Sequence, residues 1–245
     1  ELVLPRMDMP SHLAKHWTFD PSRVFLNHGS FGACPDFVIK EQRMWQDLME
    51  KEPVQFFEEL MPDILVKSRT ALGKFLSCNA NDLAFVSNAT SGVNTILRSL
   101  QFEQGDEILV PNHAYQACRN TIDFVANRWG AKVVEVAIPF PIDGPQVVID
   151  LMKSACSERT KLVMIDTVTS PTGLRMPFEE LTAFFEGKGV EVLLDAAHGI
   201  GMIPLNLGKL GASYVTSNCH KWLCAPKGSA FLYVRSDKQS KIQPL

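Results

Sequence analysis

Short apolar runs that alternate with longer amphipathic stretches constrain the fold of this chain. The runs have the length and composition of β-strands; they cover residues 83–86, 107–110, 132–136, 162–165 and 190–194. The intervening stretches are long enough for helices that cross between parallel strands; they cover residues 91–101, 116–128, 146–156 and 177–187. The sequence therefore predicts an α/β fold, a three-layer α/β/α sandwich with a mostly parallel sheet. A last run at 230–234 closely follows a turn, so we expect it to enter the sheet antiparallel.

No repeat, low-complexity tract or flexible linker divides the 245 residues. We therefore expect one domain over residues 26–245, preceded by an N-terminal arm over residues 1–25. Because the chain begins with Glu1 and ends without a closing helix after its last strand, we also expect it to be part of a longer protein.

The charge and cysteine content exclude several classes of function. The net charge of −3 gives no basic excess, which disfavours nucleic acid and anionic membranes as partners. No run reaches the roughly 18 to 20 apolar residues of a membrane helix, and the N-terminus lacks the apolar core of a signal peptide, so we expect a cytoplasmic protein. The six cysteines lack CxxC or zinc-site spacing, so no disulfide framework and no metal site is predicted.

Polar side chains follow the predicted strands, where ligands gather in parallel sheets. Asp195 ends an apolar strand, and a buried carboxylate there needs a cationic partner such as a pyridinium nitrogen, unless it caps a following helix. The residues Asn88-Ala89-Thr90-Ser91-Gly92 lead from a strand into a helix, whose N-terminus attracts phosphate; small hydroxylated residues are also ordinary helix caps. No Walker lysine or complete dinucleotide glycine motif is present.

Lys221 follows the strand residues 214–216 among small, polar and aromatic neighbours. A lysine at a partly desolvated sheet end has a lowered amine pKa and can form a Schiff base, although an isolated lysine is usually a solvated surface charge. The functional interpretation rests on its combination with Asp195 and the 88–92 segment.

Several motifs together resemble the class V branch of the fold-type I enzymes that use pyridoxal 5'-phosphate (PLP), with the closest likeness to isopenicillin N epimerase-like proteins. The motifs span residues 25 to about 235; they are Phe25-Leu26-Asn27-His28-Gly29-Ser30-Phe31-Gly32, Asn88-Ala89-Thr90-Ser91-Gly92-Val93-Asn94, Asp195-Ala196-Ala197-His198 and His220-Lys221-Trp222-Leu223-Cys224-Ala225-Pro226-Lys227-Gly228. The resemblance implies a PLP-binding large domain, a homodimer, an amino-acid substrate, and a C-terminal small domain that this chain does not include.

The resemblance also assigns roles to individual residues. It implies Lys221 as the Schiff-base lysine, Asp195 against the pyridine nitrogen, and His198 near the phenolic oxygen. His198 could otherwise simply fill its turn.

For the phosphate, the resemblance implies the segment that begins at Asn88, with Ala89 and Thr90 binding through backbone and hydroxyl groups. Ser217 and His220 would complete this phosphate site.

The remaining roles concern the cofactor ring and the substrate. Tyr115 takes the position of the ring that stacks on the cofactor, with His113 as the alternative. Thr169 would approach the ring edge, and Asn27 and His28 would face the substrate.

The sequence leaves the reaction open. The nearest resemblance favours an epimerase or racemase that acts on the α-carbon of an amino acid. A class V aminotransferase and a cysteine desulfurase or C–S lyase are the alternatives, and a PLP-binding remnant without turnover is the non-enzymatic one. Cys219 and Cys224 flank Lys221, but we expect them to pack in the fold rather than carry a persulfide.

Overall fold

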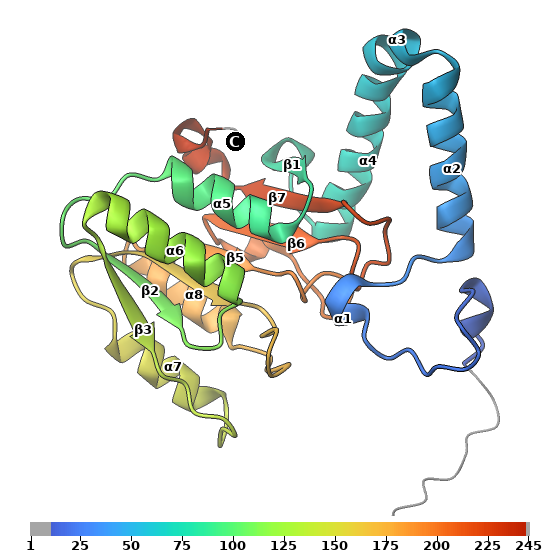
Figure 1. Ribbon diagram of the computed structural model, residues 1–245. Helices are drawn as coiled ribbons and strands as arrows, with labels where there is room; N and C mark the ends of the chain where they lie inside the picture. Colours follow the sequence, from blue (N-terminus) through green and yellow to red (C-terminus); the bar gives the residue numbers. More distant parts are fainter. Residues whose placement is uncertain (1–10, 244–245) are drawn as a thin grey trace, which may run out of the picture.

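The computed structural model describes residues 11–243 and has helices on both faces of one sheet (Figure 1). The first ten residues of the predicted arm, and residues 244–245, lie outside the described part. The helices are η1 (Ala14–His16), α1 (His28–Phe31), α2 (Asp36–Lys51), α3 (Pro53–Gln55), η2 (Phe56–Leu60), α4 (Met61–Leu76), η3 (Ala80–Asp82), α5 (Ala89–Ser99), α6 (Gln116–Trp129), α7 (Pro145–Ser154), α8 (Phe178–Gly187), α9 (Leu207–Leu210) and η4 (Ser236–Lys241). The strands are β1 (Leu83–Val86), β2 (Glu107–Pro111), β3 (Lys132–Val136), β4 (Thr160–Asp166), β5 (Glu191–Asp195), β6 (Tyr214–Asn218) and β7 (Ala230–Val234).

The sheet has seven strands in the order β1-β7-β6-β5-β4-β2-β3. Strands β2 to β6 pair in parallel, whereas β7 lies antiparallel between β6 and β1. The predicted sandwich with a mostly parallel sheet is therefore confirmed, including the antiparallel entry of the last strand. Parallel pairing brings the carboxyl ends of β4, β5 and β6 to one edge of the sheet.

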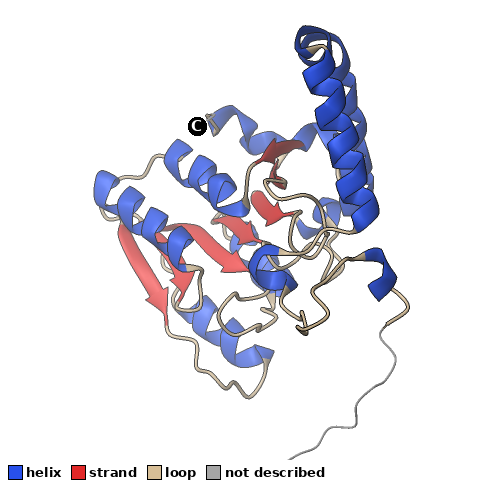
Figure 2. Ribbon diagram, turned by 45° about the vertical axis from the view of Figure 1, so that its right-hand side comes forward, coloured by secondary structure: helices blue, strands red, loops and turns tan. Residues whose placement is uncertain are grey.

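Successive residues of the central strands pack on opposite faces, as the pleat of a β-strand requires. In β5, Val192 and Leu194 join the core beneath α7 and α8, whereas Leu193 joins the core beneath α5 and α6. Figure 2 shows helices on both sides of the strands. Because both faces are covered, the central strands β2, β4 and β5 each contain an uninterrupted apolar run, which is why they stand out in the sequence.

Helices α2 and α4 form a hairpin that projects from the sandwich (Figure 1). This hairpin is not among the elements predicted from the sequence. Helix α2 has no buried residue, and α4 buries only residues near its C-terminal end, including Leu72 and Leu76. Large apolar side chains such as Phe37 and Phe57 remain exposed on the hairpin.

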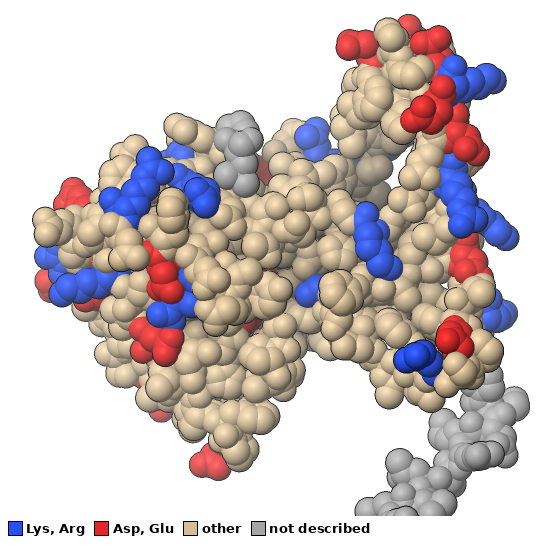
Figure 3. Space-filling view, in the orientation of Figure 1, with Lys and Arg blue, Asp and Glu red and all other residues tan. Residues whose placement is uncertain are grey.

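Lys and Arg lie interspersed with Asp and Glu on the face shown in Figure 3, both over the hairpin and over the opposite end of the molecule. Within residues 11–243, the structure has no helix with both the length and the apolar character needed to span a bilayer.

Candidate active site

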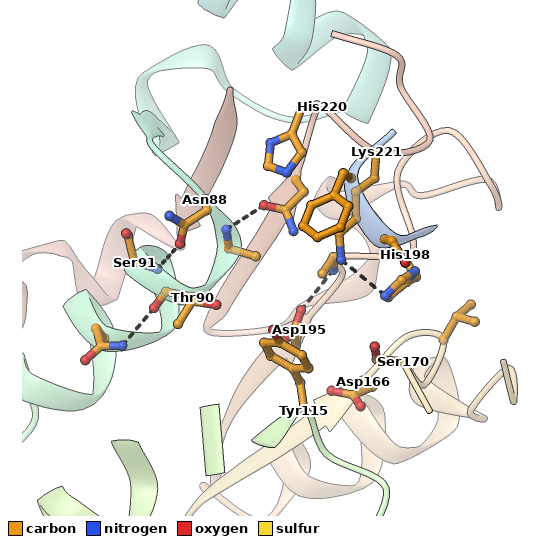
Figure 4. A pocket seen from close by; sticks show the side chains of 17 residues that line it. Asn88, Thr90, Ser91, Tyr115, Asp166, Ser170, Asp195, His198, His220 and Lys221 are labelled. Carbon is orange, nitrogen blue, oxygen red and sulfur yellow. Dashed lines mark hydrogen bonds between the residues drawn. The ribbon is translucent and has the colours of Figure 1, made fainter. Parts of the chain in front are cut away.

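A cavity of about 490 Å³ lies where the carboxyl ends of β4 to β6 meet the N-terminus of α5 (Figure 4). Eight residues predicted from the sequence line it: Asn88, Ala89, Thr90, Tyr115, Asp195, His198, His220 and Lys221. These residues come from four separate segments of the chain, at or just after the ends of β1, β2, β5 and β6, so the sheet topology assembles them as parallel strand order predicts.

The N-terminus of α5 forms one wall of this cavity. Asn88 caps the helix by accepting a 2.7 Å hydrogen bond from the Ser91 amide, so the helix-cap interpretation of this segment is correct. The helix also packs unusually close to the sheet, because a Cβ at Gly92 would lie 2.1 Å from Thr216 Oγ1. The same segment therefore caps the helix and directs its N-terminus at the cavity, where the helix dipole favours an anion.

Ser217 does not take the predicted position beside Ala89 and Thr90. It is fully buried, its hydroxyl donates to the Ala196 carbonyl, and it does not line the cavity. Adjacent strand residues face opposite sides, so the neighbouring Asn218 lines the cavity and accepts a 2.8 Å hydrogen bond from the Ala89 amide. We therefore correct the prediction: Asn218, and not Ser217, supports the start of α5.

Asp195 lies at the end of β5 and is only 4% exposed. Its Oδ1 accepts from the Ala197 amide at 2.9 Å, and its Oδ2 accepts from the Cys118 thiol at 3.4 Å. The carboxylate caps a turn, because no helix follows β5 directly. Burial raises the pKa of Asp195, while these hydrogen bonds and the nearby Lys221 amine oppose that rise. The two hydrogen bonds and the Lys221 amine thus offset only part of the cost of burying the Asp195 charge. A cationic group of a bound ligand would offset the rest.

Asp166 is a second buried carboxyl group in this cavity, and its role was not predicted from the sequence. It ends β4 and pairs in register with Asp195 on β5. Neither of its carboxyl oxygens has a hydrogen-bond partner among the described residues. Burial, followed by repulsion from Asp195, raises the pKa of Asp166 well above its usual value. Burial and the Asp195 charge therefore favour the protonated form of Asp166. The sequence feature that could have pointed to Asp166 is its place at the end of an apolar strand, the same feature that pointed to Asp195.

Lys221 extends into the cavity from the loop after β6, and its Nζ lies 3.3 Å from His198 Nε2 (Figure 4). Burial lowers the pKa of the Lys221 amine, and the charge of Asp195 opposes this effect. Burial and then the Lys221 charge lower the pKa of His198 to about 4. The other ring nitrogen of His198, Nδ1, accepts a 3.2 Å hydrogen bond from Trp222 Nε1. The site thus contains an amine of reduced basicity next to a neutral imidazole.

Tyr115, at the start of α6, lines the cavity and is 46% exposed. His113 is 6% exposed, and its ring nitrogens bond to Thr172 Oγ1 and to the Ile138 carbonyl, both at 3.0 Å. His113 is thus held by the protein and lines no part of this cavity. Tyr115, and not His113, is therefore the ring that a ligand in this cavity could contact.

The predicted residues Asn27, His28 and Thr169 lie outside the main cavity. Asn27 and Thr169 line a neighbouring cavity of about 370 Å³, which shares Tyr115 and Lys221 with the first. Asn27 also caps α1 by accepting from the Ser30 amide at 3.1 Å.

His28 lines neither cavity. Its Nδ1 accepts from the Ala33 amide at 3.3 Å, and its ring packs 6.0 Å from the Trp222 ring. The structure therefore gives His28 a packing role in the N-terminal segment.

His220 lines the cavity beside the α5 N-terminus, and its Nδ1 lies 3.1 Å from the Ser229 carbonyl. A carbonyl oxygen can only accept, so the proton of the neutral ring is on Nδ1. Burial lowers the pKa of His220. His220 can therefore donate through Nε2 only when a bound anion makes the ring cationic.

The two cysteines that flank Lys221 do not have the properties of nucleophiles. Cys219 is 4% exposed, and burial raises its pKa to about 11. Burial also raises the pKa of Cys224. The thiolate is the reactive form of cysteine, so both positions fit the expected packing role.

Comparison with known proteins supplies the family. The family described as aminotransferase class-V matches residues 52–245, most of the chain. The chain belongs to the class-V aminotransferase family. Within this family, it is 34% identical over 242 residues to the "Probable L-cysteine desulfhydrase, chloroplastic" of Arabidopsis thaliana; the match covers 92% of this chain and 51% of the relative. It is also 29% identical to the isopenicillin N epimerase of Streptomyces clavuligerus, covering 92% of this chain and 56% of that protein.

Solved structures agree with the fold. The cystine C–S lyase C-DES, in complex with its product cysteine persulfide, superposes with a TM-score of 0.81 at 22% identity, covering 90% of this chain and 59% of that one. A second C-DES structure, a mutant, has glycine covalently linked to its PLP cofactor, with a TM-score of 0.78, 22% identity, and coverage of 95% and 60%. The class-V chain described here thus spans about half to three-fifths of the length of these relatives.

Proposed function

We propose that this class-V chain binds PLP in the main cavity through Lys221 and acts as a C–S lyase on L-cysteine or a closely related amino acid. The observation that carries the cofactor assignment is the convergence of the Lys221 amine and the buried Asp195 carboxylate beside the α5 N-terminus. The Arabidopsis relative, described as a probable L-cysteine desulfhydrase, supports the choice of reaction, and the cystine C–S lyase C-DES shares the fold.

The residues present fit the parts of PLP. Asp195 provides a buried anion for the pyridine nitrogen, and Lys221 provides the amine for the aldehyde. The N-terminus of α5, with Thr90 and His220 beside it, provides a positive site for the phosphate. Tyr115 would stack on the ring, and the remaining sequence assignments for Asn27, His28 and Thr169 stay predictions.

When bound, PLP supplies an electron sink that makes the α-proton of an amino acid acidic. Lys221 would take this proton, because its amine lies in the cavity and burial has lowered its pKa. The negative charge of Asp195 would hold a proton on the pyridine nitrogen. His198 would donate a hydrogen bond from Nε2 to the phenolic oxygen of the cofactor. With cysteine and water as reactants, loss of the β-thiol yields hydrogen sulfide, and hydrolysis yields ammonia and pyruvate.

The lyase replaces the epimerase as the leading interpretation. The epimerase relative is less similar, at 29% identity, than the desulfhydrase relative at 34%. The aminotransferase and the non-catalytic PLP-binding protein remain the competing outcomes of the test.

The test begins with the absorbance of the purified protein after incubation with PLP. We expect a visible band in the wild type and none in Lys221→Ala, with Lys188→Ala as a matched control on the surface turn after α8. L-cysteine should then release sulfide and pyruvate in equal amounts. A keto acid without sulfide would indicate an aminotransferase, and deuterium exchange at the α-carbon without either product would indicate an epimerase. A band without any reaction would indicate a binding protein, and no band would refute the cofactor assignment.

The homodimer and the cytoplasmic location stay predictions. The Arabidopsis relative is described as chloroplastic, so the location of this chain requires direct imaging. Sedimentation of the purified protein with PLP would test the dimer.

A further inference from the structure

A hydrogen-bonded chain of three side chains leads from Trp222 through His198 to Lys221. Trp222 Nε1 lies 3.2 Å from His198 Nδ1, and His198 Nε2 lies 3.3 Å from Lys221 Nζ. Trp222 and Lys221 are adjacent in sequence, so one loop places the indole and the amine on the two ring nitrogens of His198. The family resemblance assigns no role to Trp222.

The chemistry of the three groups determines where the protons lie. An indole nitrogen is a donor and never an acceptor, so His198 Nδ1 must be the acceptor in its contact with Trp222. The single proton of the neutral ring is therefore on Nε2 and points at Lys221. An ammonium group has no lone pair, so a hydrogen bond from Nε2–H requires Lys221 to be a neutral amine.

The segment at α1 protects this arrangement from competing partners. A Cβ added to Gly29 would lie 3.2 Å from the His198 ring and 3.2 Å from the Trp222 ring, so the α1 backbone covers both rings closely. Trp222 also packs on the His28 ring at 6.0 Å, tilted by 34°. The indole therefore has little freedom to rotate away from His198.

We propose that Trp222 is a positioning residue that fixes the proton of His198 on Nε2 and thereby holds Lys221 as a neutral amine, ready to attack an aldehyde. This inference deepens the proposed function and rests on the role assigned there to Lys221. Without the indole N–H, the imidazole can move its proton to Nδ1 and present Nε2 as an acceptor. An ammonium group on Lys221 would then be stabilised, and fewer Lys221 amines would be nucleophilic at neutral pH.

The pH behaviour depends on all titratable groups around this chain of side chains. Those that face it come from several elements: Lys221 and His220 after β6, Asp195 at the end of β5, Asp166 at the end of β4, Tyr115 before α6, Cys118 in α6 and His28 in α1. Burial lowers the pKa of His198 to about 4 and also lowers that of Lys221, whereas Asp195 raises that of Lys221. Burial thus shifts both groups toward their neutral forms, the direction that the hydrogen-bond pattern requires.

The first test reads the proton position in the wild-type apoprotein, without any cofactor. Nitrogen-15 NMR of the histidine rings, with the His198 signals identified by their loss in His198→Gln, should show a protonated Nε2 and an unprotonated Nδ1 at neutral pH. A proton on Nδ1 would overturn the proposal. This measurement needs no variant at Trp222 and no PLP, so it stands even if the proposed function fails.

The second test uses PLP as the probe aldehyde and follows the visible absorbance that develops on Lys221 as a function of pH. Trp222→Phe keeps an aromatic ring but removes the N–H donor, and Trp129→Phe, at the end of α6, is the matched control. We expect the pH midpoint of condensation to rise by about one unit in Trp222→Phe, the size expected for one hydrogen bond, and to stay unchanged in the control. Equal midpoints in the two variants would overturn the proposal, whereas a lack of condensation in the wild type would instead refute the cofactor assignment.

Discussion

The two buried carboxyl groups at the ends of β4 and β5 predict that Asp166→Asn stabilises the apoprotein at neutral pH. Asp166 and Asp195 are register partners on adjacent strands, and neither oxygen of Asp166 has a hydrogen-bond partner among residues 11–243. Burial and Asp195 raise the pKa of Asp166 well above its usual value. The folded protein must therefore keep a proton on Asp166, or accept two adjacent buried charges.

The size of the effect follows from the sheet geometry. Neighbouring strands lie about 4.8 Å apart. At that separation and an effective dielectric constant of about 20, two carboxylates repel each other by about 3 kcal/mol. Asparagine keeps the shape of the protonated acid but carries no titratable group. We therefore expect Asp166→Asn to increase the free energy of unfolding at neutral pH by about 1–3 kcal/mol.

The sign of the pH dependence follows from proton linkage. In the unfolded chain Asp166 ionises near its ordinary pKa of about 3.9. Above that pH, the folded state therefore holds more protons than the unfolded chain does. As the pH rises, the free energy of unfolding of the wild type falls until folded Asp166 also ionises. Asp166→Asn removes this loss, and the two proteins should differ little below about pH 4.

Urea denaturation of the apoprotein at several pH values measures this difference. Asp143→Asn, at an exposed carboxylate, is the matched control and should leave the stability of the wild type almost unchanged at each pH. A lower stability of Asp166→Asn at neutral pH, or a difference that does not vary with pH, would refute the expectation that burial and Asp195 favour the protonated form of Asp166.

Three further substitutions test other parts of the site. Asp195→Asn removes the carboxyl group assigned to the pyridine nitrogen, so sulfide release from L-cysteine should fall by about 100-fold or more. Near-normal turnover would contradict this role. Gly92→Ala places a methyl group 2.1 Å from Thr216 Oγ1, so thermal unfolding should show a loss of about 1–3 kcal/mol, and unchanged stability would show that α5 can shift away from the sheet. Asn218→Ala leaves the Ala89 amide without its 2.8 Å acceptor, so equilibrium dialysis should show weaker PLP retention than in Asn206→Ala, a control at the cap of α9.

The elements of the sandwich were predictable because their signals are local. Strands buried on both faces are continuous apolar runs, and amphipathic helices repeat with the helical period, so each element can be read from its own residues. The projecting hairpin was missed because most of its apolar residues do not pack in the core of the sandwich. The positions of apolar residues in a sequence do not indicate which surface a helix packs against, or whether it packs against one at all.

Residue chemistry and the family motifs pointed to Lys221, Asp195 and the segment that begins at Asn88, which the structure places around one cavity. They could be found in the sequence because strand ends and helix starts are recognisable in one dimension. Side-chain direction was harder to predict, and the choice between Ser217 and Asn218 depended on it. A shift of one residue along β6 turns a side chain from one face of the sheet to the other.

The sequence alone determined the α/β sandwich, the strand ends that form the site, and the amine and carboxylate of the cofactor assignment. The tertiary structure decided the contacts between segments distant in sequence: the Cys118 thiol on Asp195, Asp166 beside Asp195, and the Trp222 indole on His198. The physical reason is that hydrogen bonds and charge repulsion act over a few ångströms. Their partners are fixed by strand order and register, which bring together residues that the sequence separates.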